Sequence, residues 1–155
     1  MRFVIFFLVV IAFYIGGCSL AQNASHTPTN YNVDDKETRL RMIANEWKKT
    51  PYVLGGTTKK GADCSGFAQS TLAQFNTRIP RTTTKQLRSG IKVSKSKLKT
   101  GDLIFFKTGR GPNGMHVGIY MSKGKFIHLS TKGGVREVDL NSSYWKNRYI
   151  GARRY

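Results

Sequence analysis

The sequence predicts an α+β fold, in which N-terminal helices pack on a mostly antiparallel sheet of about five strands. Apolar residues recur at helical spacing in the first half of the domain, and they alternate with polar residues in the second half. Turn residues separate the alternating segments. Helices followed by strands along the chain are typical of helices on one side of a sheet. Residues 34–155 are ordinary in number for one domain with its own core.

The first predicted helix covers residues 35–48, and Pro51 is expected to end it because proline cannot continue a helix. Tyr52 then opens a short extended segment. The apolar face of this helix consists of Leu40, Ile43, Ala44 and Trp47.

The second predicted helix begins at Cys64, directly after Asp63, which is a good N-cap residue. Unpaired N–H groups and the positive end of the helix dipole favour a thiolate in the first turn, and a thiolate is a nucleophile. A small buried cysteine without chemistry is the alternative interpretation of Cys64 alone. The buried face of the helix consists of Cys64, Phe67, Ala68, Thr71, Leu72 and Phe75.

A corner, a short helix and five strands complete the prediction. Pro80 and Arg81 form an extended corner, and Thr82–Thr84 can cap a short helix. Asp102, at the start of the first strand, is expected to be structural. The strands are predicted at residues 102–106, 115–121, 125–130, 135–140 and 149–153.

Two histidines lie in strands that the turn signal at residues 122–124 joins into a hairpin. With a three-residue loop and Gly124 in the left-handed conformation, Met121 faces Lys125. This register puts His116 and His128 on one face of the sheet as diagonal neighbours. A two-residue loop would put the two imidazoles on opposite faces, because a one-residue shift of register turns every side chain over.

A nucleophile at a helix N-terminus, a base on a strand and an orienting group on the next strand make a cysteine-peptidase triad. Cys64 would be the nucleophile, His116 the base, and His128 the group that orients His116. If the histidines lay on opposite faces, Cys64 and His116 would form a dyad, with Asn113 the nearest polar candidate for a third member. The backbone N–H of Cys64 is a candidate for the oxyanion hole.

These motifs resemble those of the NlpC family of bacterial cell-wall cysteine peptidases, from about Leu40 to the C-terminus, and enterobacterial lipoproteins of that family look most similar. The resemblance implies a papain-like NlpC fold with the catalytic cysteine at a helix N-terminus. It also implies that the protein is a peptidoglycan endopeptidase, which hydrolyses an amide bond of the stem peptide or of the cross-link. The motifs are Asp63-Cys64-Ser65-Gly66-Phe67, His116-Val117-Gly118-Ile119-Tyr120 and His128, with similar segments at 50–56, 79–81, 101–106 and 151–154.

The resemblance assigns roles to three further residues. The Tyr52 hydroxyl would complete the oxyanion hole, although a core tyrosine is the alternative. Asp63 and Ser65 would line the pocket that receives a free amine of the stem peptide. Two other functions stay open, namely a non-catalytic cell-wall-binding lipoprotein and an acyltransferase or amidase of the same superfamily. The bond that is cut also stays open, between D-Glu and the diamino acid or between the diamino acid and D-Ala in a cross-link.

The N-terminus has the order of regions found in an exported lipoprotein. Arg2 precedes an apolar run over residues 3–15, which is long enough for a signal peptide and short for a spanning helix. Residues 15–18 resemble a bacterial lipobox, which predicts a signal peptide at 1–17 and a lipid on Cys18; ordinary cleavage nearby or an uncleaved anchor are the alternatives. Residues 18–33 then read as a flexible tether. Because Ser19 follows the cysteine, we expect anchoring in the outer membrane, facing the periplasm.

The chain has 26 basic and 8 acidic residues, a formal net charge of +18. An exported protein with this charge meets peptidoglycan carboxylates and lipid phosphates, so we expect no nucleic-acid partner. The expected partners are peptidoglycan stem peptides and, through the lipid on Cys18, the membrane. One of the two cysteines is assigned to the lipid and Cys64 to chemistry, which leaves no disulfide. We expect a monomer with no cofactor and no metal.

Overall fold

The structure is a computed structural model that describes residues 33–110 and 112–155. The predicted signal peptide, the lipidation site Cys18 and the tether up to residue 32 lie outside the described residues. The first helix, α1, covers Val33–Glu46, so residue 33 belongs to this helix and not to the tether. The helix ends five residues before Pro51 and continues into a turn, in which the Thr50 N–H donates to the Trp47 carbonyl at 3.0 Å.

Three more helices follow, and two of them were predicted. Helix α2 covers Cys64–Ala73 and α3 covers Thr83–Arg88, where the Thr82 hydroxyl accepts a hydrogen bond from the Lys85 N–H as a cap. The one-turn helix α4, Ser143–Lys146, was not predicted because four residues carry no helical periodicity.

The main sheet has six antiparallel strands in the order β3-β8-β4-β5-β6-β7. The five predicted strands are all present within one residue at each end. Strand β3 was not predicted because it has only three residues, of which Ile91 and Lys92 are exposed. Its pairing with β8 makes it part of the sheet. A separate two-stranded sheet pairs β1 (Thr57–Thr58) with β2 (Gly61–Ala62). The main strands are β3 (Ile91–Val93), β4 (Leu103–Lys107), β5 (Met115–Tyr120), β6 (Lys125–Leu129), β7 (Val135–Asp139) and β8 (Tyr149–Arg154).

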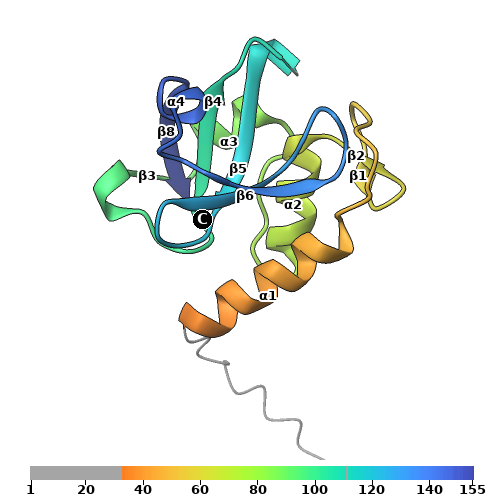
Figure 1. Cartoon of the computed structure of the whole chain (residues 1–155), viewed down its shortest axis with the longest axis horizontal. Helices are drawn as coiled ribbons and strands as arrows, with labels where there is room; N and C mark the ends of the chain where they lie inside the picture. The colour runs from red at the N-terminus through yellow and green to blue at the C-terminus, as the bar shows by residue number, and fades with distance from the viewer. Residues whose placement is uncertain (1–32, 111) are drawn as a thin grey trace, which may run out of the picture.

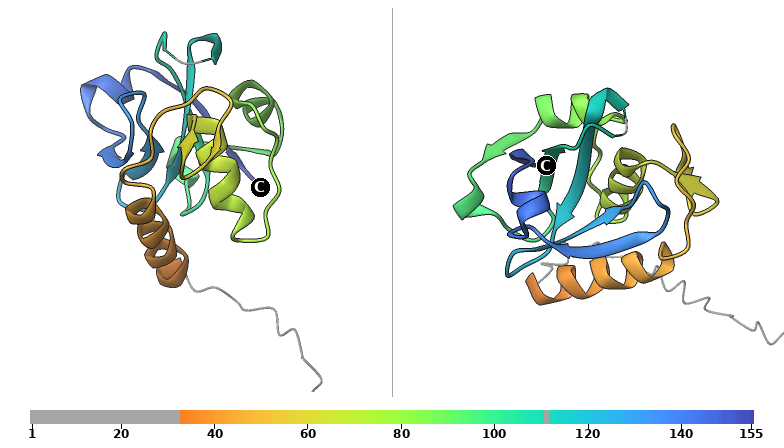
Figure 2. Two further views of the ribbon diagram at one scale, coloured as in Figure 1. Left: turned by 90° about the vertical axis from the view of Figure 1, so that its right-hand side faces the viewer. Right: turned by 45° about the horizontal axis from the view of Figure 1, so that its top comes forward.

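Each face of the sheet carries its own hydrophobic cluster. Helices α1, α2 and α3 cover one face, where Leu40 and Phe67 pack against strand residues such as Ile119. On the opposite face, Trp145 of α4 packs against a smaller cluster around Phe106. The views agree that α2 and α4 lie on opposite sides of β4 and β5 (Figures 1 and 2). The prediction of helices on one side is therefore right for α1–α3, and α4 is the exception.

The β5–β6 hairpin has the predicted register. Ile119 pairs with Ile127, and the Met121 N–H donates to the Lys125 carbonyl at 2.9 Å across the three-residue loop. Gly124 has φ +74°, as expected for the left-handed position. Beyond Ile119 and Ile127 the pairing ends and the two strands diverge (Figure 1). This divergence opens the sheet next to the residues predicted to form the site.

Candidate active site

The N-terminus of α2 is fixed by the cap that the sequence predicted. Asp63 has extended backbone angles, and its carboxylate accepts hydrogen bonds from the N–H groups of Gly66 at 2.7 Å and Gly55 at 2.8 Å. A Cβ on Gly66 would lie 2.1 Å from the Gly56 carbonyl oxygen, so only glycine lets the preceding loop close onto the helix. The cap and this close contact together fix Cys64 in the first turn of α2.

Arg81 completes this end of the site, and the sequence analysis had not paired it with Asp63. Its guanidinium donates to both carboxylate oxygens of Asp63, at 2.8 and 2.9 Å, and to the Ser65 hydroxyl at 3.0 Å. Burial raises the pKa of Asp63, but the bonds from Arg81, Gly66, Gly55 and Ser65 outweigh it, so the pKa is lowered overall. Asp63 and Ser65 are thus already bonded to a cation, and their contact with a substrate amine stays a prediction.

Cys64 is fully buried, and its sulfur lies 3.7 Å from the Thr83 hydroxyl oxygen. Burial raises the pKa of the thiol, whereas the N–H groups of Val117 and Ser65 and the Thr83 hydroxyl lower it. Burial prevails, so the expectation of a thiolate favoured by the helix N-terminus is wrong for this structure. Cys64 is a neutral thiol at neutral pH.

The end of the β5–β6 ladder explains why the sulfur meets Val117. The Tyr120 N–H donates to Asp102 on the β4 side, and the Met121 N–H donates to Lys125 on the β6 side. Because these directions alternate along an antiparallel strand, the Val117 N–H points toward β6. Pairing with β6 has already ended there, and the Cys64 sulfur takes the place of a strand partner. The sulfur therefore lies beside the backbone of the residue that follows His116.

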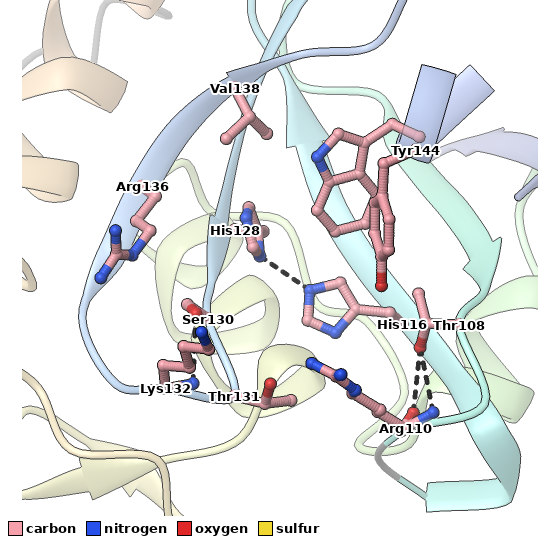
Figure 3. Close-up of a pocket in the computed structure, with 11 residues that line it drawn as sticks. Thr108, Arg110, His116, His128, Ser130, Thr131, Lys132, Arg136, Val138 and Tyr144 are labelled. Atoms are coloured by element: carbon pink, nitrogen blue, oxygen red, sulfur yellow. Dashed lines mark hydrogen bonds between the residues drawn. The ribbon is translucent and has the colours of Figure 1, made fainter. Parts of the chain in front are cut away.

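His116 and His128 lie on one face, as predicted, and hydrogen-bond to each other. The Nε2 atom of His116 is 2.8 Å from Nδ1 of His128, and the two rings are nearly perpendicular (Figure 3). Trp145 packs against both rings, with centroid distances of 5.8 Å to His116 and 4.9 Å to His128. Burial lowers the pKa of His116 to about 4, and burial followed by the charge of His116 lowers that of His128 to about 3. Both imidazoles are neutral at neutral pH.

Two neutral imidazoles share one hydrogen bond only if one of them donates. When His116 carries its proton on Nε2, it donates to Nδ1 of His128 and keeps Nδ1 free to accept a proton. In that arrangement His128 accepts the hydrogen bond and favours the tautomer of His116 that can act as a base. In the described residues no hydrogen bond joins Cys64 to His116; the fold brings the histidines together and sets the sulfur next to the strand that carries His116.

The Tyr52 hydroxyl is buried and has no hydrogen-bond partner among the described residues. Burial, followed by the charges that Cys64 and Asp63 carry when they are ionised, raises the pKa of Tyr52 to about 12, which places the ring near both residues. A bridge between Tyr52 and Ala62 holds this segment beside the loop that leads into α2. A neutral donor that lacks a partner beside the sulfur has the chemistry that an oxyanion hole requires, and the role of Tyr52 there stays a prediction.

A cavity of about 260 Å³ opens beside the histidine pair (Figure 3). Apart from the histidines, none of its lining residues was predicted, because they come from four separate segments that only the tertiary fold joins. They are Thr108, Arg110, Ser130, Thr131, Lys132, Arg136, Val138, Tyr144 and Trp145.

Two other polar residues lie outside the site. Asn113 is exposed and donates to the Thr84 hydroxyl at 3.3 Å, and with the histidines on one face it is not needed as a third member. Asp102 is buried and accepts two hydrogen bonds of 2.7 Å from Arg154, as expected for a structural residue.

The described part of the chain contains no group of three His, Cys, Asp or Glu side chains that could hold a metal ion. None of its helices combines the length and apolar character needed to cross a bilayer.

Several bacterial proteins of known name or structure are similar to this chain in sequence or fold. The chain is 39% identical over 158 residues to "Probable endopeptidase NlpC" of Escherichia coli (strain K12), covering 99% of both chains. It is 48% identical over 124 residues to "Murein DD-endopeptidase MepS/Murein LD-carboxypeptidase" of the same organism, covering 79% of this chain and 64% of that protein. An NLP/P60 family protein similar to lipoproteins, from Staphylococcus aureus subsp. aureus Mu50, superposes with a TM-score of 0.69 and 31% identity over 83% of this chain and 44% of that one.

The family comparison agrees with the resemblance drawn from the motifs. Residues 49–154, well over half of the chain, match the model of the NlpC/P60 family. The matched region contains the capped helix with Cys64 and the hairpin with both histidines, and its solved relatives share the helices and the antiparallel sheet. The protein belongs to the NlpC/P60 family.

Proposed function

We propose that this protein is a peptidoglycan endopeptidase that uses Cys64 as nucleophile, His116 as general base and acid, and His128 as a positioning residue. The names of the relatives, an endopeptidase and a murein DD-endopeptidase, support the substrate class. One observation carries the mechanism, namely the 2.8 Å hydrogen bond between His116 and His128. His116 lies on β5, and the backbone of this strand contacts the sulfur of Cys64 in the first turn of α2.

The reaction begins with a neutral thiol and a neutral imidazole. The thiol proton of Cys64 passes to Nδ1 of His116 as the sulfur attacks the carbonyl carbon. The carbonyl oxygen becomes an oxyanion, to which the Cys64 N–H and the Tyr52 hydroxyl donate hydrogen bonds. His116 then returns the proton to the amine nitrogen, the C–N bond breaks, and a thioester remains on Cys64.

Hydrolysis of the thioester repeats these steps with water. His116 takes a proton from the water as its oxygen attacks the thioester carbon. The C–S bond then breaks, the acid product leaves, and His116 returns the proton to the sulfur. The low pKa of His116 makes its protonated form a stronger acid than an ordinary imidazolium, which favours protonation of the leaving amine. His128 accepts the Nε2–H bond throughout and stabilises the imidazolium while it exists.

We infer from the sequence that Cys18 carries lipid and anchors the protein in the cell envelope, in the outer membrane facing the periplasm. The order of a basic residue, an apolar run and small residues before Cys18 supports this. Cys18 lies 15 residues before α1 begins, and a flexible tether of this length would allow the domain to reach substrate at some distance from the membrane.

The test uses the two cysteines as matched variants. Purified full chain is incubated with muropeptides, and mass spectrometry identifies the amide that is cut. Cys64→Ala should keep the fold and abolish cleavage, whereas Cys18→Ala should keep cleavage and leave the membrane fraction. Cleavage by Cys64→Ala at wild-type rates would contradict the mechanism. Glycan that is retained but uncut would indicate a binding protein, and exchange of acyl groups would indicate a transferase.

A further inference from the structure

The cavity beside the histidines carries three cations, Arg110, Lys132 and Arg136, and the described residues that line it include no carboxylate. We call it the basic cavity. Among residues 33–110 and 112–155 none of these three side chains has an ion-pair partner, and six acidic side chains pair with other cations. Those pairs are Glu37 and Glu137 with Arg41, Glu46 with Lys59, Asp63 with Arg81, Asp139 with Lys125, and Asp102 with Arg154.

The three cations reach the basic cavity from separate segments. Arg110 follows β4, Lys132 lies in the loop between β6 and β7, and Arg136 lies on β7. The Arg110 side chain extends below the His116 ring, while Lys132 and Arg136 lie on the opposite side of the cavity (Figure 3). Like charges that converge on one cavity repel one another, and a bound anion would relieve that repulsion.

The position of the basic cavity relates it to one side of the scissile bond. In the proposed mechanism the leaving amine must lie at His116 to receive its proton, while the carbonyl carbon lies at Cys64. His116 and His128 both line the basic cavity. A carboxylate on the carbon that bears the amine has its carbon only about 2.5 Å from the nitrogen, from standard bond lengths and angles. Such a group would enter the basic cavity when the amine is at His116.

We propose that the basic cavity binds a free carboxylate carried by the same carbon as the leaving amine of the substrate. Guanidinium groups such as those of Arg110 and Arg136 bind carboxylates through paired hydrogen bonds. Tyr144 and Trp145 form an aromatic wall that packs against the carbon chain of the leaving residue. The proposal rests on the proposed function, and it selects peptides whose leaving residue is anionic next to the cut bond.

Two substrates carry this chemistry. One is a peptide whose last residue is released as a free amino acid, and the other is a cross-link in which a diamino acid is joined through its side-chain amine. For each, the full chain is given a matched pair of peptides, with the carboxylate next to the leaving amine free or converted to a carboxamide. The acid of at least one pair should be cleaved with a kcat/KM about tenfold above that of its amide, as expected for a charge-assisted hydrogen bond. The pair that shows the preference identifies which of the two substrates supplies the carboxylate.

A variant with Arg110→Gln and Arg136→Gln should lower the ratio of acid to amide cleavage to about one. The control variant Lys92→Gln and Lys97→Gln removes the same charge from exposed residues away from the basic cavity and should keep the wild-type ratio. Equal cleavage of acid and amide by the wild type in both pairs would overturn the carboxylate site and leave the proposed function standing.

Binding separates this inference from the proposed function. Full-length Cys64→Ala, which cannot turn over, is titrated calorimetrically with the intact acid and amide peptides. The acid should bind about tenfold more tightly, and that difference should disappear when Arg110→Gln and Arg136→Gln are added. If the wild type cleaves no peptide, the proposed function fails, and this difference still supports the basic cavity. Equal binding of acid and amide would overturn the basic cavity whatever the cleavage result.

Discussion

On the nucleophile side of the site, around Cys64, a buried carboxylate has oxygens saturated with hydrogen bonds, whereas the histidine side, around His116 and His128, holds three cations that have no ion-pair partner in the part of the chain that the structure describes. Asp63 receives bonds from two backbone N–H groups, from Ser65 and from both terminal nitrogens of Arg81. Arg110 and Arg136 have no such bonds within the described residues. The first side holds the Cys64 backbone in place, and the second is the side that we propose receives a charged group from the substrate.

The two sides also differ in the protonation states that they favour. Around Asp63 the protein stabilises a charge, since its hydrogen bonds lower the pKa of the carboxyl despite burial. Around the thiol and the imidazoles it disfavours charge, because burial raises the pKa of Cys64 and lowers those of His116 and His128. The reacting groups therefore rest in their neutral forms and become charged only as a proton moves between them.

The largest effect should come from breaking the link between the two sides. His116→Ala should lower kcat/KM by more than about 1000-fold, as much as Cys64→Ala does, because neither residue works without the other. The double variant Cys64→Ala and His116→Ala should be no worse than either single variant. Steady-state cleavage of a muropeptide measures all three, with circular dichroism to check the fold. Losses that multiply in the double variant would mean that the two residues act independently.

Removing Arg81 should damage the stability of the nucleophile side. Arg81→Met leaves the buried Asp63 carboxylate without its cation and should lower the free energy of unfolding by about 3 kcal/mol. The matched control is Arg78→Met, an exposed arginine three residues earlier, which should change it by less than about 0.5 kcal/mol. Urea denaturation measures both variants. Equal stabilities for the two would show that the bonds to Arg81 contribute little to holding the cap.

The role of His128 can be separated from a purely structural role by two replacements. His128→Ala removes the acceptor for His116 and should lower kcat by about 10- to 100-fold, less than the loss of His116 itself. His128→Asn can place its side-chain oxygen near the former Nδ1 position, so it should recover part of that loss. If Asn restores no activity while both variants are equally stable, the hydrogen bond to His116 is not what His128 contributes.

Acid should destabilise the histidine side first. The folded pKa values of about 4 for His116 and about 3 for His128 lie below the ordinary value of 6.5. Below pH 6.5 the unfolded chain binds protons that the folded chain does not. The free energy of unfolding is therefore not reduced by these histidines above pH 6.5. It falls by about 1.4 kcal/mol per pH unit for each histidine down to about pH 4. Denaturant unfolding at pH 7, 5.5 and 4.5 measures this slope, and His128→Gln should reduce it by about half. An unchanged slope in that variant would contradict the shift of His128.

The sequence determined the local parts of this site because their causes lie within a few residues. Asp63 caps α2 through Gly66, three residues later, so spacing alone indicates where the helix begins and which turn contains Cys64. The odd length of the 122–124 loop fixes the strand parity, and parity decides that His116 and His128 share a face. Both follow from the helical and strand periods, which need no knowledge of the rest of the fold.

Only the tertiary structure decided what surrounds these residues. Arg81 lies 18 residues after Asp63, and no local period connects them. The burial that reverses the expected shift of Cys64 depends on how α2 enters the gap between β5 and β6. The basic cavity joins segments more than 30 residues apart, from Thr108 to Trp145. Charge state and cavity shape depend on which elements pack together, and packing is a property of the whole chain because each element buries its apolar face against distant ones.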